Sequence, residues 1–225
     1  MNILALDSAS KTCSACALNT ETGQYALYFG DAESNHSVTL LPAARRALED
    51  LRLTVADLDR IAVTVGPGSF TGVKIGVSAV KGLAFPHNTP CVAVSPLEAL
   101  AEEARHTDGT VAALLDARRN QFYNAMFTVE NGVLRRCTPD RQIRADELAK
   151  EIRGTVRLVG DGAPLFARFC EEQNLPAVRE ENADRISALA VARLAQNATT
   201  VSAEALAPVY LRPSQAERIR LGLPD

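Results

Sequence analysis

Hydrophobic and polar residues alternate with a period of two in three segments at the start of the chain, 2–7, 13–18 and 24–30. Such alternation is typical of strands that bury one face, and the turn-forming residues Glu21-Thr22-Gly23 separate the last two segments. Three strands joined by short turns predict an antiparallel meander.

Apolar positions spaced for helices follow, separated by short apolar runs. They predict helices over 37–51, over 71–85 and from Ser95 onward, with strands over 61–65 and 91–94 between them. Ser95-Pro96-Leu97-Glu98 marks the start of the third helix, because Ser is favoured at the N-cap, Pro at the first helical position and Glu at the third. The first half therefore has the element order βββαβαβα.

The second half repeats this order. Strands are predicted over 111–116, 121–129 and 133–138, with Asn131-Gly132 as a hairpin turn, then a helix over 145–152, a strand over 156–160, and helices over 163–173 and 185–196. The third crossover strand is weak or lost near 177–179. Ser214-Gln215-Ala216-Glu217 is a capping box that predicts a short terminal helix.

Two α/β units with this order, side by side, describe a duplicated actin/hexokinase-like (ASKHA) fold with two βββαβα(β)α subdomains, the second partly reduced. We place the subdomains at 1–106 and 107–225. A single mixed sheet is the alternative.

The glycine-rich run Gly66-Pro67-Gly68-Ser69-Phe70-Thr71-Gly72 joins a predicted strand to a predicted helix. Glycine permits positive φ and close backbone approach, and Thr71 is placed to cap the helix. An anion cradle is one interpretation, because helix N-termini favour phosphate. The spacing fits neither the P-loop nor the dinucleotide fingerprint, so a packing joint is the alternative.

Composition limits the classes of protein. The chain has 225 residues, 47% of them hydrophobic, which is enough for one large core or two small ones. No apolar run approaches the roughly 20 residues that span a bilayer, and the start lacks the basic region of a signal peptide, so a cytoplasmic protein without membrane contact is expected. The five cysteines, at scattered positions, favour reduced thiols over a disulfide framework.

The formal net charge of −3 argues against a chain that grips nucleic acid unaided. Basic residues do cluster in the second half and the tail, but no aromatic residues interleave with them, so a solvated surface is the favoured interpretation. These residues are Arg135, Arg136, Arg141, Arg144, Arg212, Arg218 and Arg220.

Asp7 and Asp116 end the first strand of each half, where actin-like proteins carry acidic residues beside phosphate-binding turns. With Ser8, Ser10 and Arg118 they form a candidate, vestigial nucleotide site. Ala9 stands where phosphate-gripping members carry glycine, and its Cβ would crowd a phosphate. Asp116 to Arg119 either present a carboxylate and two guanidiniums or form a surface turn, and Gly160-Asp161-Gly162 reads as a helix cap.

No metal site or cofactor is predicted, because the only histidines, His36, His87 and His106, lack a partner at helical spacing. His36 more simply orients a helix start. No serine stands in a nucleophile-elbow motif.

The two long helices of the first half carry a small-residue stripe and an apolar stripe. Gly72, Gly76 and Ala79 fall on one face of the second helix, and Leu41, Ala44 and Leu48 on one face of the first. From the pattern alone, each stripe fits the protein's own core or a partner helix pair equally well.

The chain resembles the TsaB (YeaZ) family. The resemblance spans the sequence, is weakest after about residue 174, and rests above all on the GPGSFTG run. The matching segments are 3–9, 36–42, 66–76, 81–84, 95–101 and 116–118.

The resemblance implies a non-catalytic partner subunit that TsaD needs to transfer threonylcarbamoyl to N6 of the adenosine 3′ of the anticodon, in tRNAs reading codons that start with A. It further implies a heterodimer with TsaD, a TsaE-type ATPase in a larger complex, a homodimer when alone, and tRNA contact only through the complex. The implied partner interface comprises Ser37, Leu40, Leu41, Phe70, Gly72, Gly76, Val77 and Val80.

On this basis Gly76→Arg is expected to block the partner and leave the fold largely intact. Two other functions stay open. One is a stand-alone actin-like small-molecule kinase or nucleotide hydrolase that uses Asp7 and Asp116, and the other is a homodimeric scaffold.

Overall fold

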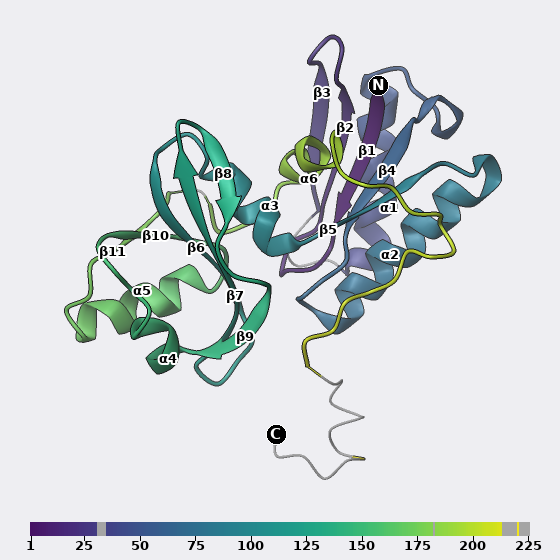
Figure 1. The fold of residues 1–225 in the computed structure, drawn as a ribbon. Coiled ribbons are helices and arrows are strands. Elements are labelled where there is room, and N and C mark those ends of the chain that lie inside the picture. The colour runs from purple at the N-terminus through teal and green to yellow at the C-terminus, as the bar shows by residue number, and fades with distance from the viewer. Residues whose placement is uncertain (31–34, 182, 213–219, 221–225) are drawn as a thin grey trace.

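Two mixed sheets, each with helices packed on it, make up two lobes (Figure 1). The computed structural model describes residues 1–30, 35–181, 183–212 and 220. The predicted terminal helix with its capping box lies outside these residues. Within them, no helix is both long and apolar enough to cross a bilayer.

The sheet of the first lobe confirms the predicted meander followed by parallel crossovers. Its strand order is β3-β2-β1-β4-β5, in which β1, β2 and β3 are antiparallel and β4 and β5 run parallel to β1. The strands are β1 (Asn2–Asp7), β2 (Ser14–Asn19), β3 (Tyr25–Phe29), β4 (Arg60–Thr64) and β5 (Cys91–Val94).

Helices α1 (His36–Asp50) and α2 (Phe70–Ala84) pack beside each other on this sheet, and α6 (Ala188–Ala195) covers its other face (Figure 1). Helix α3 (Pro96–Glu103) packs on α6 and on the sheet of the second lobe. Ser95 caps α3 as predicted, because its hydroxyl accepts a hydrogen bond from the Glu98 N–H at 3.4 Å. Two short 3₁₀ turns, η1 (Val55–Asp57) and η2 (Phe85–His87), follow α1 and α2.

The second lobe has strand order β11-β10-β6-β7-β8, and β9 pairs with the far end of β7. The third crossover strand, predicted to be weak or lost, is present as β11 and runs parallel to β10. Strand β9 was not predicted, since three of its four residues are polar. The elements are β6 (Gly109–Asp116), β7 (Gln121–Glu130), β8 (Val133–Arg136), β9 (Arg141–Arg144), α4 (Ala145–Ala149), β10 (Val156–Val159), α5 (Ala163–Glu172) and β11 (Ala177–Arg179).

The end of the chain returns to the first lobe. Helix α6 contacts β1, β2, β4 and α3, so the predicted division at 106/107 separates the sheets but assigns this helix to the wrong lobe. The reason is that α6 is apolar around most of its circumference, and such a helix requires cover on several sides. Ser14 of β2 fixes its start, accepting from the Ala188 N–H at 2.9 Å and donating to the Ile186 carbonyl at 3.0 Å.

One hydrophobic core fills the first lobe and continues across α3 onto one face of the second sheet, where it includes Val111 and Phe127. A smaller core lies on the other face of that sheet, beneath α4 and α5. The lobes are therefore joined by shared packing on the α3 side. The five cysteines are unpaired thiols, and only Cys137 is exposed.

Candidate functional site

Asp7 ends β1 and is completely buried. One carboxylate oxygen, Oδ1, accepts from the Thr64 hydroxyl at 2.6 Å and from the Ala9 N–H at 3.1 Å. The other, Oδ2, has no hydrogen-bond partner among the described residues. Burial raises the pKa of Asp7 to about 7, although the bonds from Thr64 and Ala9 oppose the shift.

The glycine run packs directly on the turn that follows Asp7. A Cβ at Gly68 would collide with the Ala9 carbonyl oxygen, and one at Gly72 with the Ser8 carbonyl oxygen. The Ser69 N–H donates to that same Ala9 carbonyl at 2.7 Å. These glycines permit backbone to lie against backbone, so the run acts as a packing joint against Ser8 and Ala9.

Ser69, and not Thr71, caps α2. Its hydroxyl accepts from the Gly72 N–H at 3.2 Å, while Thr71 is the second residue of the helix and is exposed. The prediction of Thr71 as the cap was wrong because the helix begins at Phe70, one residue earlier than the pattern indicated.

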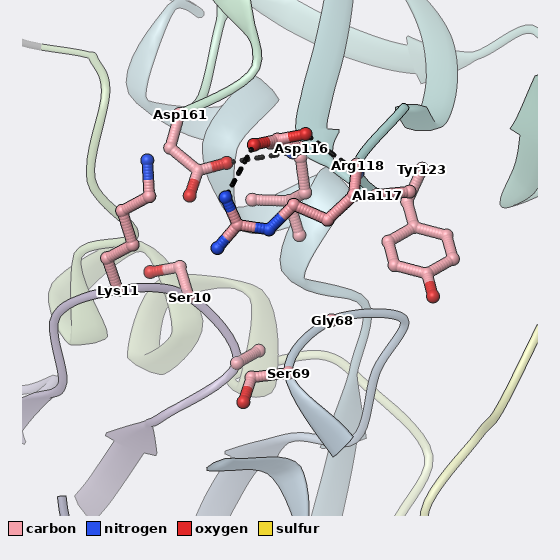
Figure 2. A pocket seen from close by; sticks show the side chains of 11 residues that line it. Ser10, Lys11, Gly68, Ser69, Asp116, Ala117, Arg118, Tyr123 and Asp161 are labelled. Carbon is pink, nitrogen blue, oxygen red and sulfur yellow. Dashed lines mark hydrogen bonds and ion pairs between the residues drawn. The ribbon is translucent and has the colours of Figure 1, made fainter. Parts of the chain in front are cut away.

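A cleft of about 360 Å³ lies between the lobes, beside this joint (Figure 2). The first lobe contributes the turn after β1 and the start of α2, and the second lobe contributes the loops after β6 and β10. The lining residues are Ala9, Ser10, Lys11, Gly68, Ser69, Leu115, Asp116, Ala117, Arg118, Tyr123 and Asp161.

The charged groups of the cleft bind one another. Asp116 accepts from the Arg118 N–H at 2.8 Å and pairs with the Arg118 guanidinium at 3.5 Å. Asp161 accepts from the Asp116 N–H at 3.0 Å, and burial raises the pKa of Asp161. Figure 2 shows the Arg118 guanidinium between the two carboxylates and the Lys11 ammonium on the Asp161 side. The 116–119 segment is therefore an Asp-capped turn that also presents a carboxylate and one guanidinium, that of Arg118, to the cleft.

The structure brings together part of the predicted nucleotide site. Ser10, Asp116 and Arg118 line the cleft, whereas Asp7 and Ser8 are buried beside it. The Ser8 hydroxyl donates to the Gly72 carbonyl at 2.8 Å and so belongs to the packing joint.

Sequence reasoning missed Lys11, Ser69, Tyr123 and Asp161 as cleft residues. A usable signal existed for Asp161, because β10 runs parallel to β6 and the carboxyl ends of parallel strands meet at one sheet edge. Asp161 follows β10 there as Asp116 ends β6, so both acids could have been assigned to one site.

The predicted partner interface needs correction. Leu40, Val77 and Val80 are buried in the first lobe's core, as are Gly72 and Gly76, so these residues present no surface to a partner. Gly76 lies against Ser8 and Val63, because the small-residue stripe lets α2 approach the sheet closely. Of the predicted set, Ser37 and Leu41 are exposed and Phe70 is half-buried.

The outward side of α1 carries apolar surface that the pattern left unassigned. The side chains of Val38 and Leu41 are 66% and 45% exposed. Beside them lies a groove of about 660 Å³ that we call the α1–α2 groove. Its lining residues are Leu4, Leu41, Pro42, Ala44, Arg45, Leu48, Glu49, Leu53, Thr54, Val55 and Leu83.

His36, Arg136 and Arg141 make structural contacts within the chain. A ring nitrogen of His36, Nε2, lies 3.2 Å from the Lys11 carbonyl oxygen, so His36 ties the start of α1 to the turn after β1. In the second lobe, Arg136 pairs with Glu98 and Arg141 with Glu151. In the part of the chain that the structure describes, no three His, Cys, Asp or Glu side chains are grouped to hold a metal ion.

Comparison with known proteins assigns the family. The model of the TsaD family, described as tRNA N6-adenosine threonylcarbamoyltransferase, matches residues 30–219. The tRNA threonylcarbamoyladenosine biosynthesis protein TsaB of Bacillus subtilis is 35% identical over 96% of both chains, and that of Escherichia coli is 30% identical over 96% of both.

A solved structure, YeaZ from Pseudomonas aeruginosa, superposes with a TM-score of 0.76 at 28% identity, covering 93% of this chain and 99% of that one. The match confirms the predicted fold over almost the whole length. This chain is a member of the TsaD-related family and, within it, of the TsaB (YeaZ) proteins.

Proposed function

We propose that this chain is the non-catalytic partner subunit of a TsaD-type transferase. In that role it supports transfer of threonylcarbamoyl to N6 of the adenosine 3′ of the anticodon, in tRNAs reading codons that start with A. The relatives named as tRNA threonylcarbamoyladenosine biosynthesis proteins support the pathway. The geometry of the site supports a division of roles in which this chain is the partner and the TsaD-type protein is the catalyst.

The observation that carries the proposal is the α1–α2 groove with its exposed apolar rim. Val38 and Leu41 expose large apolar side chains next to a mainly apolar groove, and contiguous apolar surface of this kind marks protein interaction sites. The occupant we propose is the TsaD-type subunit. Because the TsaD family model also describes this chain, such a partner has an equivalent helix pair to pack against α1 and α2.

The cleft supports a non-catalytic role. Asp7, the acid of the first strand, is completely buried and does not line the cleft. The remaining acids, Asp116 and Asp161, are engaged with Arg118 and with backbone. To bind in the cleft, a nucleoside triphosphate would have to displace the packed glycine run 66–72, which we call the glycine joint. It would also have to break the contacts of Asp116 and Asp161 with Arg118 and the backbone.

The complex we propose includes a TsaE-type ATPase, contacts tRNA through its other subunits, and acts in the cytoplasm. Alone, the chain pairs with a second copy through the same α1–α2 groove. Homodimer and heterodimer then exclude each other, because both use one surface.

The decisive experiment mixes the purified chain with the TsaD-type protein of the same organism. Size-exclusion chromatography with light scattering should give a one-to-one complex, and threonylcarbamoyl transfer to tRNA should require both proteins. Leu41→Glu should abolish the complex, since it places a charge on the rim of the groove. Val178→Glu is the matched control, because Val178 is a 54% exposed apolar residue on β11, in the other lobe.

The stand-alone kinase or hydrolase is tested with the same preparation. Calorimetry with ATP and Mg²⁺ should show no tight binding by the pure chain, and phosphate release should stay at the background rate. Tight binding with turnover, together with no complex, would replace the partner function with a phosphotransfer activity in the cleft.

A further inference from the structure

The last described stretch of the chain runs along the first lobe, past β5 and α2 (Figure 1). Val201 pairs with Cys91 of β5 through two backbone hydrogen bonds of 2.9 and 2.8 Å. Further on, the Lys81 ammonium of α2 donates to the Glu204 carbonyl at 3.1 Å. These two contacts hold residues 201–204 against the first lobe, and the segment after them, which we call the tail, continues to the glycine joint.

At the joint the tail is held tightly. The Val209 N–H donates to the Val65 carbonyl at 2.7 Å. Gly66 has φ +107°, and a Cβ there would collide with the Val209 carbonyl oxygen, so this glycine is required by the tail. The ring of Tyr210 packs on Phe70 with centroids 4.5 Å apart.

From the joint the tail reaches the second lobe. The Arg212 guanidinium donates to the Ala117 carbonyl at 3.3 Å, and Ala117 lines the cleft between Asp116 and Arg118. The loop it touches is strained, because Arg118, Arg119 and Asn120 have φ of 70°, 56° and 56°. The left-handed region is unfavourable for residues other than glycine, so neighbouring contacts must hold the loop in place.

The lobes meet on the opposite side as well. There the shared core runs through α3 to Phe127 of β7, and Glu98 of α3 pairs with Arg136 of β8 at 2.8 Å. A two-lobed protein with packed contact on one side can open about that side as a hinge. A contact between the lobes on the side away from α3 would then limit how far the cleft opens.

We infer that residues 206–212 form a strap that fixes the opening of the interlobe cleft, with Arg212 as the residue that fastens it to the second lobe. The strap is anchored on the same joint that packs over Ala9, so the position of the tail and the width of the cleft are coupled. This inference goes beyond the proposed function and requires no partner protein.

Electron spin distances on the full-length chain test the inference. One label goes on Cys137, the exposed cysteine of the second lobe, and the other on Ser78→Cys on the exposed side of α2; the four other cysteines are buried. Arg212→Ala in this labelled chain should broaden the interlobe distance distribution and shift it to longer values. Arg168→Ala is the control, since Arg168 is an exposed arginine on α5 that pairs with Glu172 of the same helix.

Amide hydrogen exchange of the same variants gives a second readout. Loss of the Arg212 bond should speed exchange in residues 117–121 by about fivefold, the factor that a net hydrogen-bond contribution near 1 kcal/mol predicts. An unchanged distance distribution in Arg212→Ala would overturn the strap, even with faster exchange, because Arg212 would then order the loop without holding the lobes.

Discussion

Gly76 of α2 lies directly against Ser8 of the turn after β1: a Cβ on the glycine would stand 2.5 Å from the Ser8 hydroxyl oxygen. The same Ser8 hydroxyl donates to the Gly72 carbonyl, one helical turn earlier. Helix α2 is thus fixed to the first strand through glycines that face inward, and its outward face is left for other contacts.

We therefore expect Gly76→Ala to destabilise the isolated chain, by about 1–3 kcal/mol as overpacked core sites do, and Gly76→Arg to prevent folding. This reverses the sequence-based expectation of an intact fold. Urea unfolding followed by circular dichroism measures the difference. Gly82→Ala is the control on the same helix, because Gly82 is exposed with open space around it, and it should gain about 0.5–1 kcal/mol.

Ser69→Ala should cost about 1 kcal/mol of unfolding free energy, since it removes the hydroxyl that caps α2. Thr71→Ala should change the unfolding free energy by less than half as much. Thermal melts of the two variants under identical conditions make the comparison. Equal losses would show that the hydroxyl of Ser69 contributes no capping.

Asp7 should make stability depend on pH in an identifiable direction. Its pKa is about 7 in the folded chain and 3.8 in the unfolded one, so the folded chain binds the extra proton between these values. The stability that this proton contributes is complete below pH 3.8 and is lost as the pH rises through 7.

Asp7→Asn is uncharged at every pH and removes this loss. Relative to wild type, the variant should therefore gain stability from pH 4 to pH 8, by up to about 4 kcal/mol at about 1.4 kcal/mol per pKa unit. Urea titrations at several pH values measure the gain. Parallel stability curves for the two proteins would show that Asp7 does not titrate in this range.

Ala9→Gly should not restore nucleotide binding. Removal of the methyl group leaves the backbone carbonyl of residue 9 bonded to the Ser69 N–H and in contact with Gly68, so the glycine run stays packed against this residue. Calorimetry should give the same absence of heat with ATP and Mg²⁺ for both proteins. Binding by the glycine variant alone would show that the methyl group is the barrier.

Most strands and helices were predictable because their signals are local in the sequence. Examples are the alternation of hydrophobic and polar residues in the first three strands and the N-cap of α3 at Ser95. Strand β11 was harder to predict, because its three residues are stabilised by pairing with β10 and not by their own pattern. The lobe that α6 joins depends on contacts with β1 and β2, which lie far away in the sequence. No local pattern carries that information.

The candidate site shows the same limit. Periodicity identified the stripes of α1 and α2 but could not tell which faced the sheet, so buried residues such as Val77 were predicted at the interface. The difference is set by Gly76, whose missing side chain lets α2 lie close to Ser8 and Val63. Only the packed structure shows what a glycine is close to.

The return of the chain to the first lobe has a consequence for synthesis on the ribosome. Among the described helices and strands β1 is made first, yet the core around it is completed by α6, which is made after the whole second lobe. The strands and helices of the second lobe, from β6 to β11, are contiguous in the sequence, so they can pair with one another while the first lobe still waits for its final helix. Of the two lobes, the one that is begun first is therefore the one that is finished last.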